Sequence, residues 1–111
     1  MRKLLALISI TALAAAFAVP ALGATSVKKV KVGPLFSFGP KKLTIKRGTK
    51  VKFNWTGSLL HNVTVKKGPA KFHSKTQTRG SYSHRFTKKG TYTLVCTIHQ
   101  AAGMKMTIKV T

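Results

Sequence analysis

Three side chains that can bind a metal lie close together near the C-terminal end of the sequence. Cys96 and His99 are three positions apart, and Met104 follows five positions later. The residues between His99 and Met104 are small enough for the chain to turn back, so one loop can present a thiolate, an imidazole and a thioether to a common point. His61, from a separate segment, can supply a second imidazole.

This combination of ligand types favours copper. A thiolate with two imidazoles and a weak thioether suits copper, with the methionine sulfur as a long axial ligand. Structural zinc usually takes four good donors from cysteine and histidine, and haem is disfavoured because no Cys-x-x-Cys-His sequence is present. We therefore predict one copper per chain, bound by His61, Cys96, His99 and Met104.

Each of these residues also has an ordinary structural interpretation. A single buried cysteine is usually inert, and a methionine at the start of a strand usually belongs to the core, which is the role we assign to Met106. We assign His73 and His84 to the surface or to hydrogen-bonded positions. The copper hypothesis depends on all four ligand types occurring together, three of them in one loop.

The segments that must position these residues have the pattern of β-strands. Val51, Phe53 and Trp55 alternate with polar residues, and so do the apolar positions of 104–110. Such alternation indicates strands with one buried face and one wet face. Glycine and proline turns separate the strands, and no helical period is evident, so the sequence predicts an antiparallel, all-β sandwich or barrel in one domain.

Strand parity also predicts where two of the ligands point. His61 shares a strand face with Val63 and Val65, and Cys96 shares one with Leu94. Because side chains alternate across a strand, both His61 and Cys96 should point inward, each at the end of its strand.

The N-terminal residues have the features of a secretory signal peptide. Arg2 and Lys3 precede an uncharged apolar run from 4 to 19, and small residues follow at 21–24. The alternative is a membrane anchor, but the run is shorter than the ~20 residues that span a bilayer. We predict a signal peptide at 1–23 and a domain at 24–111, exported to the periplasm, the cell surface or the extracellular space. Such a protein cannot form an internal disulfide with a single cysteine, and a metal would protect Cys96 from oxidation.

The charge of the chain is extreme. It contains 21 lysines and arginines and no aspartate or glutamate. The missing carboxylates exclude glycosidase, aspartic-protease and Ser-His-Asp chemistry, and they leave calcium without ligands. The positive field should attract anionic surfaces. Nucleic acid is not expected as a partner, because the protein is predicted to be exported and its lysines alternate along strands instead of clustering.

The motifs around the ligands resemble the cupredoxins, and among them plastocyanin and pseudoazurin. The resemblance lies in the Cys-x2-His-x4-Met spacing after the Gly-Thr-Tyr strand at 90–92, in the His61-Asn62 pair, and in the stretch 38–48. It implies a Greek-key β-sandwich of about eight strands with copper near one end. It also implies that Asn62 tethers the two ligand-bearing segments by hydrogen bonds. Met106 stands where the family often has glycine, and the acidic patches of many plastocyanins are absent.

Electron transfer is the function that this site predicts. All four ligands come from the protein, whereas a catalytic metal needs an open position. A copper-delivery protein could use the same ligands, and a module that binds anionic polymers would need none of them; an enzyme is the least favoured class. We expect a monomer with redox partner proteins, acidic in character, and anionic cell-surface polymers or membrane as further partners. Residues 35, 36 and 60 are expected to form an apolar rim beside His99, whose edge the resemblance implies is the electron port.

Overall fold

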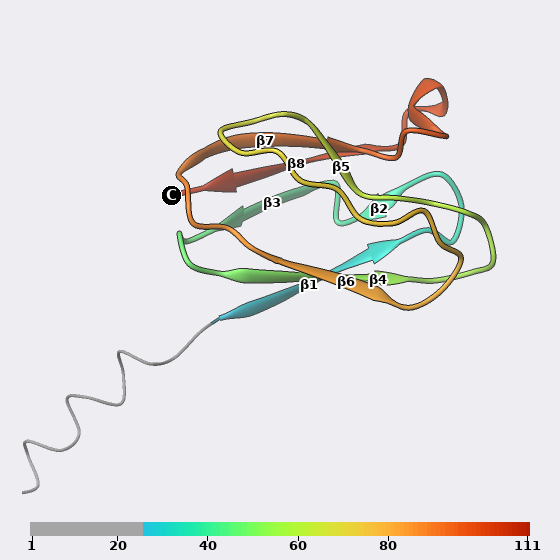
Figure 1. Cartoon of the computed structure of the whole chain (residues 1–111), viewed down its shortest axis with the longest axis horizontal. Coiled ribbons are helices and arrows are strands. Elements are labelled where there is room, and N and C mark those ends of the chain that lie inside the picture. The colour runs from blue at the N-terminus through green and yellow to red at the C-terminus, as the bar shows by residue number, and fades with distance from the viewer. Residues whose placement is uncertain (1–25) are drawn as a thin grey trace, which may run out of the picture.

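The computed structural model describes residues 26–111, which form two packed layers of β-strands (Figure 1). The predicted signal peptide lies outside the described residues. Within 26–111, no helix is both long enough and apolar enough to cross a membrane. The elements in chain order are β1 (Val27–Val32), β2 (Phe38–Gly39), β3 (Lys42–Ile45), β4 (Lys50–Trp55), β5 (Thr64–Lys67), β6 (Ser81–Arg85), β7 (Gly90–Val95), the 3-10 helix η1 (Gln100–Ala102) and β8 (Lys105–Val110).

Each layer is a four-stranded sheet. The strand order is β2-β1-β4-β6 in one sheet and β3-β8-β7-β5 in the other. Strands that are neighbours in the sheet are often distant in the chain, as in a Greek key, so the predicted all-β sandwich is confirmed. The expectation of purely antiparallel pairing was wrong for two pairs, because β1 runs parallel to β4 and β3 runs parallel to β8. Alternation of apolar and polar residues reports which face is buried and carries no information on strand direction.

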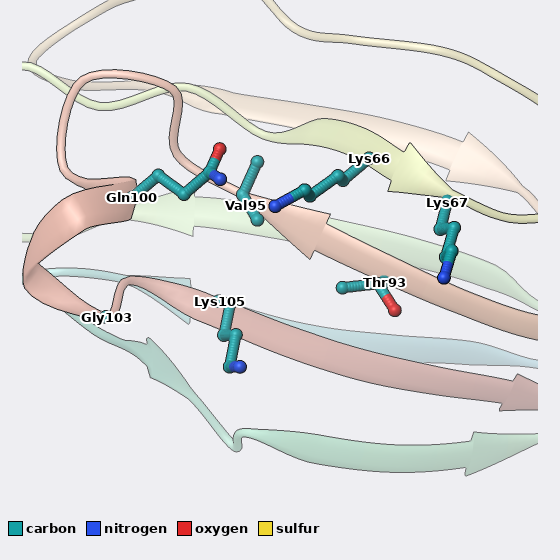
Figure 2. A pocket seen from close by; sticks show the side chains of 7 residues that line it. All are labelled: Lys66, Lys67, Thr93, Val95, Gln100, Gly103 and Lys105. Carbon is teal, nitrogen blue, oxygen red and sulfur yellow. The ribbon is translucent and has the colours of Figure 1, made fainter.

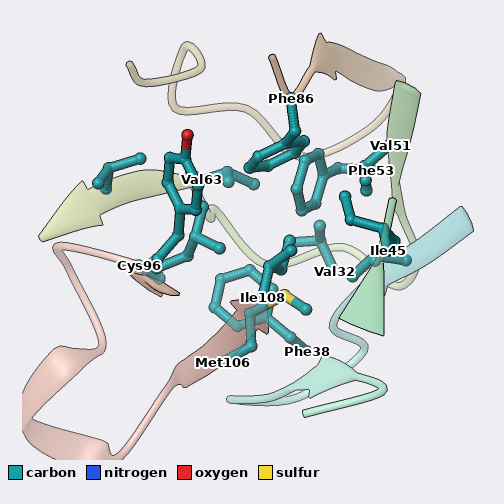
Figure 3. Packing of buried hydrophobic residues seen from close by; sticks show 14 of the residues in the cluster. Val32, Phe38, Ile45, Val51, Phe53, Val63, Phe86, Cys96, Met106 and Ile108 are labelled. Carbon is teal, nitrogen blue, oxygen red and sulfur yellow. The ribbon is translucent and has the colours of Figure 1, made fainter. Parts of the chain in front are cut away.

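The core fills the space between the sheets (Figure 3). Every second residue of β4 is buried, namely Val51, Phe53 and Trp55. Met106 is also buried in this cluster, as predicted. Cys96 belongs to the same cluster, so its sulfur lies at the margin of the apolar core. The residues that form the core are Val30, Val32, Phe38, Ile45, Val51, Phe53, Trp55, Val63, Val65, Phe86, Tyr92, Leu94, Cys96, Met104, Met106, Ile108 and Val110.

An aromatic group surrounds the imidazole of His84 on β6. The His84 ring stacks on Phe72 with 3.6 Å between ring centroids and meets Phe86 edge-on at 4.9 Å. Burial in this apolar setting lowers the pKa of His84 below 6.5. His84 therefore packs as a neutral ring and takes no part in the metal site.

This packing predicts a pH dependence of stability. The unfolded chain protonates His84 near its ordinary pKa of about 6.5, whereas the folded chain protonates it only at lower pH. The free energy of unfolding of the copper-loaded protein should therefore fall as pH is lowered from about 7 through this window. Urea denaturation at a series of pH values measures this dependence. His84→Gln should reduce the slope of the free energy of unfolding against pH. An unchanged slope in that variant would contradict the assignment.

Candidate metal centre

The loop between β7 and β8 carries three of the four predicted ligands. Cys96 follows the last residue of β7, and Met104 precedes the first residue of β8. The backbone N–H of Cys96 donates to the Met104 carbonyl (3.1 Å), and the N–H of His99 donates to the Cys96 carbonyl (3.1 Å). The N–H of Met104 in turn donates to the His99 carbonyl (3.2 Å). These bonds close the loop on itself and fix the three residues relative to one another.

The turn at the tip of this loop is the short helix η1. It ends at Ala102 and is capped by Gly103, whose φ of 88° lies in the left-handed region that glycine enters without steric cost. The N–H of Gly103 donates to the Gln100 carbonyl at 2.9 Å. The predicted reversal between His99 and Met104 is thus a single 3-10 turn.

His61 reaches the same end of the sandwich from a separate segment. It pairs with Gln77 through two backbone hydrogen bonds of 3.0 Å, as an isolated bridge before β5 begins. Its carbonyl also accepts a hydrogen bond from the indole N–H of Trp55 (3.1 Å). His61 is fully buried. The predicted inward direction is confirmed, although His61 lies outside the regular strand on which the prediction placed it.

The backbone packs closely against the far side of the His61 ring. A Cβ atom on Gly33 would lie 3.4 Å from Nε2 of His61 and 2.6 Å from the Thr56 carbonyl oxygen, and Gly33 has φ of 96°. Only glycine fits this position without strain. Nε2 is buried and has no hydrogen-bond partner among residues 26–111, so the orientation of this ring is set largely by packing and by the groups around Nδ1.

Three donor atoms converge where these segments meet. Nδ1 of His61 lies 3.1 Å from Nδ1 of His99, and Sγ of Cys96 lies 3.8 Å and 3.7 Å from the two nitrogens. Two donors bonded to one ion at about 2.0–2.3 Å must lie within roughly 4.6 Å of each other, and all three separations meet this condition. Burial, and then the neighbouring His99, lower the pKa of His61, so its imidazole is neutral and its lone pair is available.

Met104, the fourth predicted ligand, lies at the end of the same loop. Its side chain is fully buried, and its backbone is bonded to both Cys96 and His99. The thiolate and two imidazoles that converge are soft and intermediate donors, the same loop also carries the Met104 thioether, and no carboxylate is available to add a hard donor. The donor set therefore fits copper.

Asn62 joins the two segments that carry the donors. Its Oδ1 accepts hydrogen bonds from the Thr97 backbone N–H (3.1 Å) and the Thr64 hydroxyl (2.9 Å). Its Nδ2 donates to the hydroxyls of Thr97 (2.8 Å) and Thr76 (3.0 Å). Asn62 adjoins His61, and Thr97 adjoins Cys96, so the tether that the family resemblance implied is confirmed.

Comparison with known proteins decides the family. The model of copper-binding proteins of the plastocyanin/azurin family matches residues 24–111. The chain belongs to this family. It is a cupredoxin, a blue-copper electron-transfer protein with one type 1 copper. Comparison of the sequence with curated proteins gave no match.

Solved structures of other cupredoxins share the fold. Oxidised plastocyanin from Dryopteris crassirhizoma is 27% identical, with a TM-score of 0.67, over 75% of this chain and 99% of that one. A Cu(I) amicyanin variant is 25% identical, with a TM-score of 0.67, over 82% of this chain and 88% of that one. A copper-containing nitrite reductase from Thermus scotoductus is 30% identical, with a TM-score of 0.67, over 76% of this chain but only 22% of its own.

The apolar side chains expected beside His99 are exposed in this cupredoxin. Leu35, Phe36 and Leu60 are 66%, 45% and 52% exposed. The Phe36 ring lies 4.5 Å from the ring of His99, which is only partly buried. Phe36 is therefore confirmed beside His99, while Leu35 and Leu60 are exposed and adjoin Phe36 and His61 in the chain. Ile98, next to His99 in the chain, is also exposed (49%). It was not among the apolar residues expected beside His99.

Sequence reasoning missed several residues that support the cupredoxin site. Thr64, Thr76 and Thr97 satisfy Asn62, and Trp55 holds the His61 backbone. Sequence alone does not distinguish a threonine or tryptophan that supports a metal ligand from any other, because the supporting contacts form only in the folded chain. His73 is exposed, which agrees with the surface role assigned to it.

Proposed function

We propose that this cupredoxin carries single electrons on a copper ion held by His61, Cys96, His99 and Met104. The observation that supports the ligand set is the convergence of Sγ of Cys96 and the two Nδ1 atoms within 3.8 Å of one another. Copper held by these residues would supply one-electron chemistry between Cu(II) and Cu(I). The surrounding protein holds the donors rigid, through the closed loop and the Asn62 tether, so that little rearrangement accompanies either state.

A carrier role is favoured over an enzyme role. Four protein donors leave no position for a substrate, and no acidic side chain is present for proton transfer. The nitrite reductase that resembles this chain contains much additional protein, since this chain covers only 22% of it. His99 is the partly exposed donor, and it lies beside Phe36, so we assign the electron port to its edge.

A redox titration tests this function. The purified protein should bind one copper per chain, show intense visible absorption in the oxidised form, and bleach and recover in a reversible one-electron titration. Copper binding without a reversible couple would instead indicate copper delivery. Absence of bound copper would contradict the proposed function altogether.

We propose that the protein works outside the cytoplasm, as a monomer. The basic and apolar N-terminal sequence, with small residues at 21–24, supports export through a signal peptide at 1–23. Analysis of the N-terminus of the secreted protein, together with cell fractionation, tests the location. Retention of the full N-terminus on a cytoplasmic protein would contradict it.

We propose further that the redox partner is acidic. Removal of Arg2 and Lys3 with the signal peptide takes two from the 21 basic residues and leaves 19, with no opposing side-chain charge. A positive field of this kind steers an acidic partner and raises the rate of association. Anionic cell-surface polymers and membranes would be attracted by the same field.

Salt should therefore slow electron transfer to an acidic acceptor protein. The Debye length falls from ~30 Å at 0.01 M to ~10 Å at 0.1 M ionic strength, so the second-order rate should drop by about tenfold or more over this range. Stopped-flow spectroscopy measures the rate, with a basic acceptor of similar potential as control. A rate that is independent of salt, or equal for both acceptors, would contradict the steering.

A further inference from the structure

A groove lined by lysines lies on the outer face of the β3-β8-β7-β5 sheet, beside the loop that carries the ligands (Figure 2). Lys66 and Lys67 extend from β5 across β7, and Lys105 stands on β8 on the other side. Thr93 and Val95 form the floor between them. Gln100 and Gly103, from the turn of the ligand loop, close one end, and the cavity measures about 490 Å³.

A β-bulge brings two consecutive lysines to this groove. Val65 pairs with Leu94, but Lys67 pairs with Thr93, so the register of β5 shifts by one residue between them. In a regular strand Lys67 would point to the same side as the buried Val65. The bulge turns Lys67 outward beside Lys66, and both are exposed. On the opposite side, Lys105 pairs with Val95, which places the backbone of Lys105 directly beside the floor of the groove.

The groove has positive charge and no internal partner for it. No hydrogen bond within residues 26–111 uses the ammonium groups of Lys66, Lys67 or Lys105, and the sequence contains no acidic side chain that could pair with them. Three cations held on one surface repel one another, and an anion between them would relieve this. Beside the lysines, the floor offers a hydroxyl at Thr93 next to the almost fully buried Val95, and the rim offers an amide at Gln100.

The position of the groove connects it with electron transfer. Val95 immediately precedes Cys96, and Gln100 immediately follows His99. A second depression continues the groove across β8, sharing Gly103 and Lys105 and adding Lys41 and Lys42. A protein segment bound here is thus held against the ligand loop, on a surface distinct from the apolar rim around Phe36.

We infer that this groove binds glutamate or aspartate side chains of the acidic redox partner, an inference that rests on the proposed function. The volume of about 490 Å³, the lysines on both sides and the position beside the ligand loop favour a short acidic protein segment. An anionic polymer would instead bind over the whole positively charged surface, because lysines occur on both sheets and not only beside the ligand loop.

Binding of hexaglutamate to the copper-loaded protein tests the groove directly. The test variant is the triple substitution Lys66→Gln, Lys67→Gln and Lys105→Gln. The matched control is Lys28→Gln, Lys46→Gln and Lys88→Gln, which removes the same net charge from exposed positions outside the groove. At about 0.02 M ionic strength, we expect Kd to rise about tenfold in the groove variant and less than about twofold in the control. In the Cu(I) protein, amide NMR shifts caused by the peptide should centre on Thr93, Val95 and Lys105.

Two results would overturn the inference. Equal weakening in both triple variants would show that the peptide responds only to net charge. The second result is displacement of hexaglutamate by polyphosphate when the concentration of polyphosphate, counted in negative charges, is ten times lower than that of the peptide. That result would show that the occupant is a phosphate polymer and not an acidic protein. The visible spectrum and the reversible couple of each variant are measured in parallel, so a failure of the proposed electron transfer is distinguished from a failure of the groove.

Discussion

Cys96→Ser is expected to abolish the intense visible colour of the copper protein. The absorption arises from charge transfer between the thiolate and copper, and a serine hydroxyl supplies neither that transition nor soft donation. Cys96 is fully buried and 3.7–3.8 Å from both Nδ1 atoms, and it is the single cysteine of the sequence, so no other thiolate can take its place. Absorption spectroscopy of the oxidised variant, with copper measured independently, gives the result.

Met104→Leu is the matched comparison for this result. It also removes a buried sulfur, but an axial thioether tunes the potential more than it holds the metal. Leucine has similar volume, so the core around position 104 should tolerate it, at a cost below about 1.5 kcal/mol. The variant should remain coloured and shift in potential. A Cys96→Ser protein that stayed blue would refute the thiolate ligand, and a colourless Met104→Leu protein would refute a merely axial role.

Asn62→Ala should weaken copper binding by about 10–100-fold, the usual cost of losing a group that orients metal ligands. The change deletes four hydrogen bonds and leaves the Thr97 backbone N–H without its Asn62 partner. At about 1 kcal/mol for each bond, a loss of stability of roughly 2–4 kcal/mol accompanies it. Competition with a copper chelator measures the affinity, and urea denaturation measures the stability.

Thr76→Ala provides the control for the tether. It removes one hydrogen bond from Asn62 but leaves both bonds to Thr97, which connect the His61 and Cys96 segments. Its copper affinity should change by less than about threefold. If Asn62→Ala left affinity, stability and potential unaltered, or if both variants behaved alike, the bond between the segments would have no role in holding the site.

The inward direction of Cys96 could be predicted from sequence because it depends on local periodicity. Cys96 continues the buried positions of β7, and the spacing from Cys96 to Met104 allows one turn. The core positions of β4 followed from the same alternation. The identity of copper came from donor chemistry, which does not depend on the details of the fold.

Other features could not be predicted because they depend on contacts between distant segments. The parallel pairing of β1 with β4 depends on how the chain crosses between sheets, and no residue of β1 indicates its neighbour. The bulge in β5 appears as an ordinary run of lysines, and the partners of Asn62 are threonines indistinguishable from surface ones. The close approach of Gly33 to His61 likewise requires the folded backbone.

The separation of His61 from the other donors gives copper a second effect, on chain entropy. His61 and Cys96 are 35 residues apart in the chain, and their ring nitrogen and sulfur are 3.8 Å apart in the fold. An ion bound to both closes a long loop, as a covalent cross-link would, and closing such a loop restricts the unfolded chain. The metal-loaded protein must therefore release copper from at least one segment before it can unfold fully. Its resistance to denaturation should then follow copper occupancy, and because the ligands are assembled only in the folded chain, that resistance is gained on metal binding and lost on chelation.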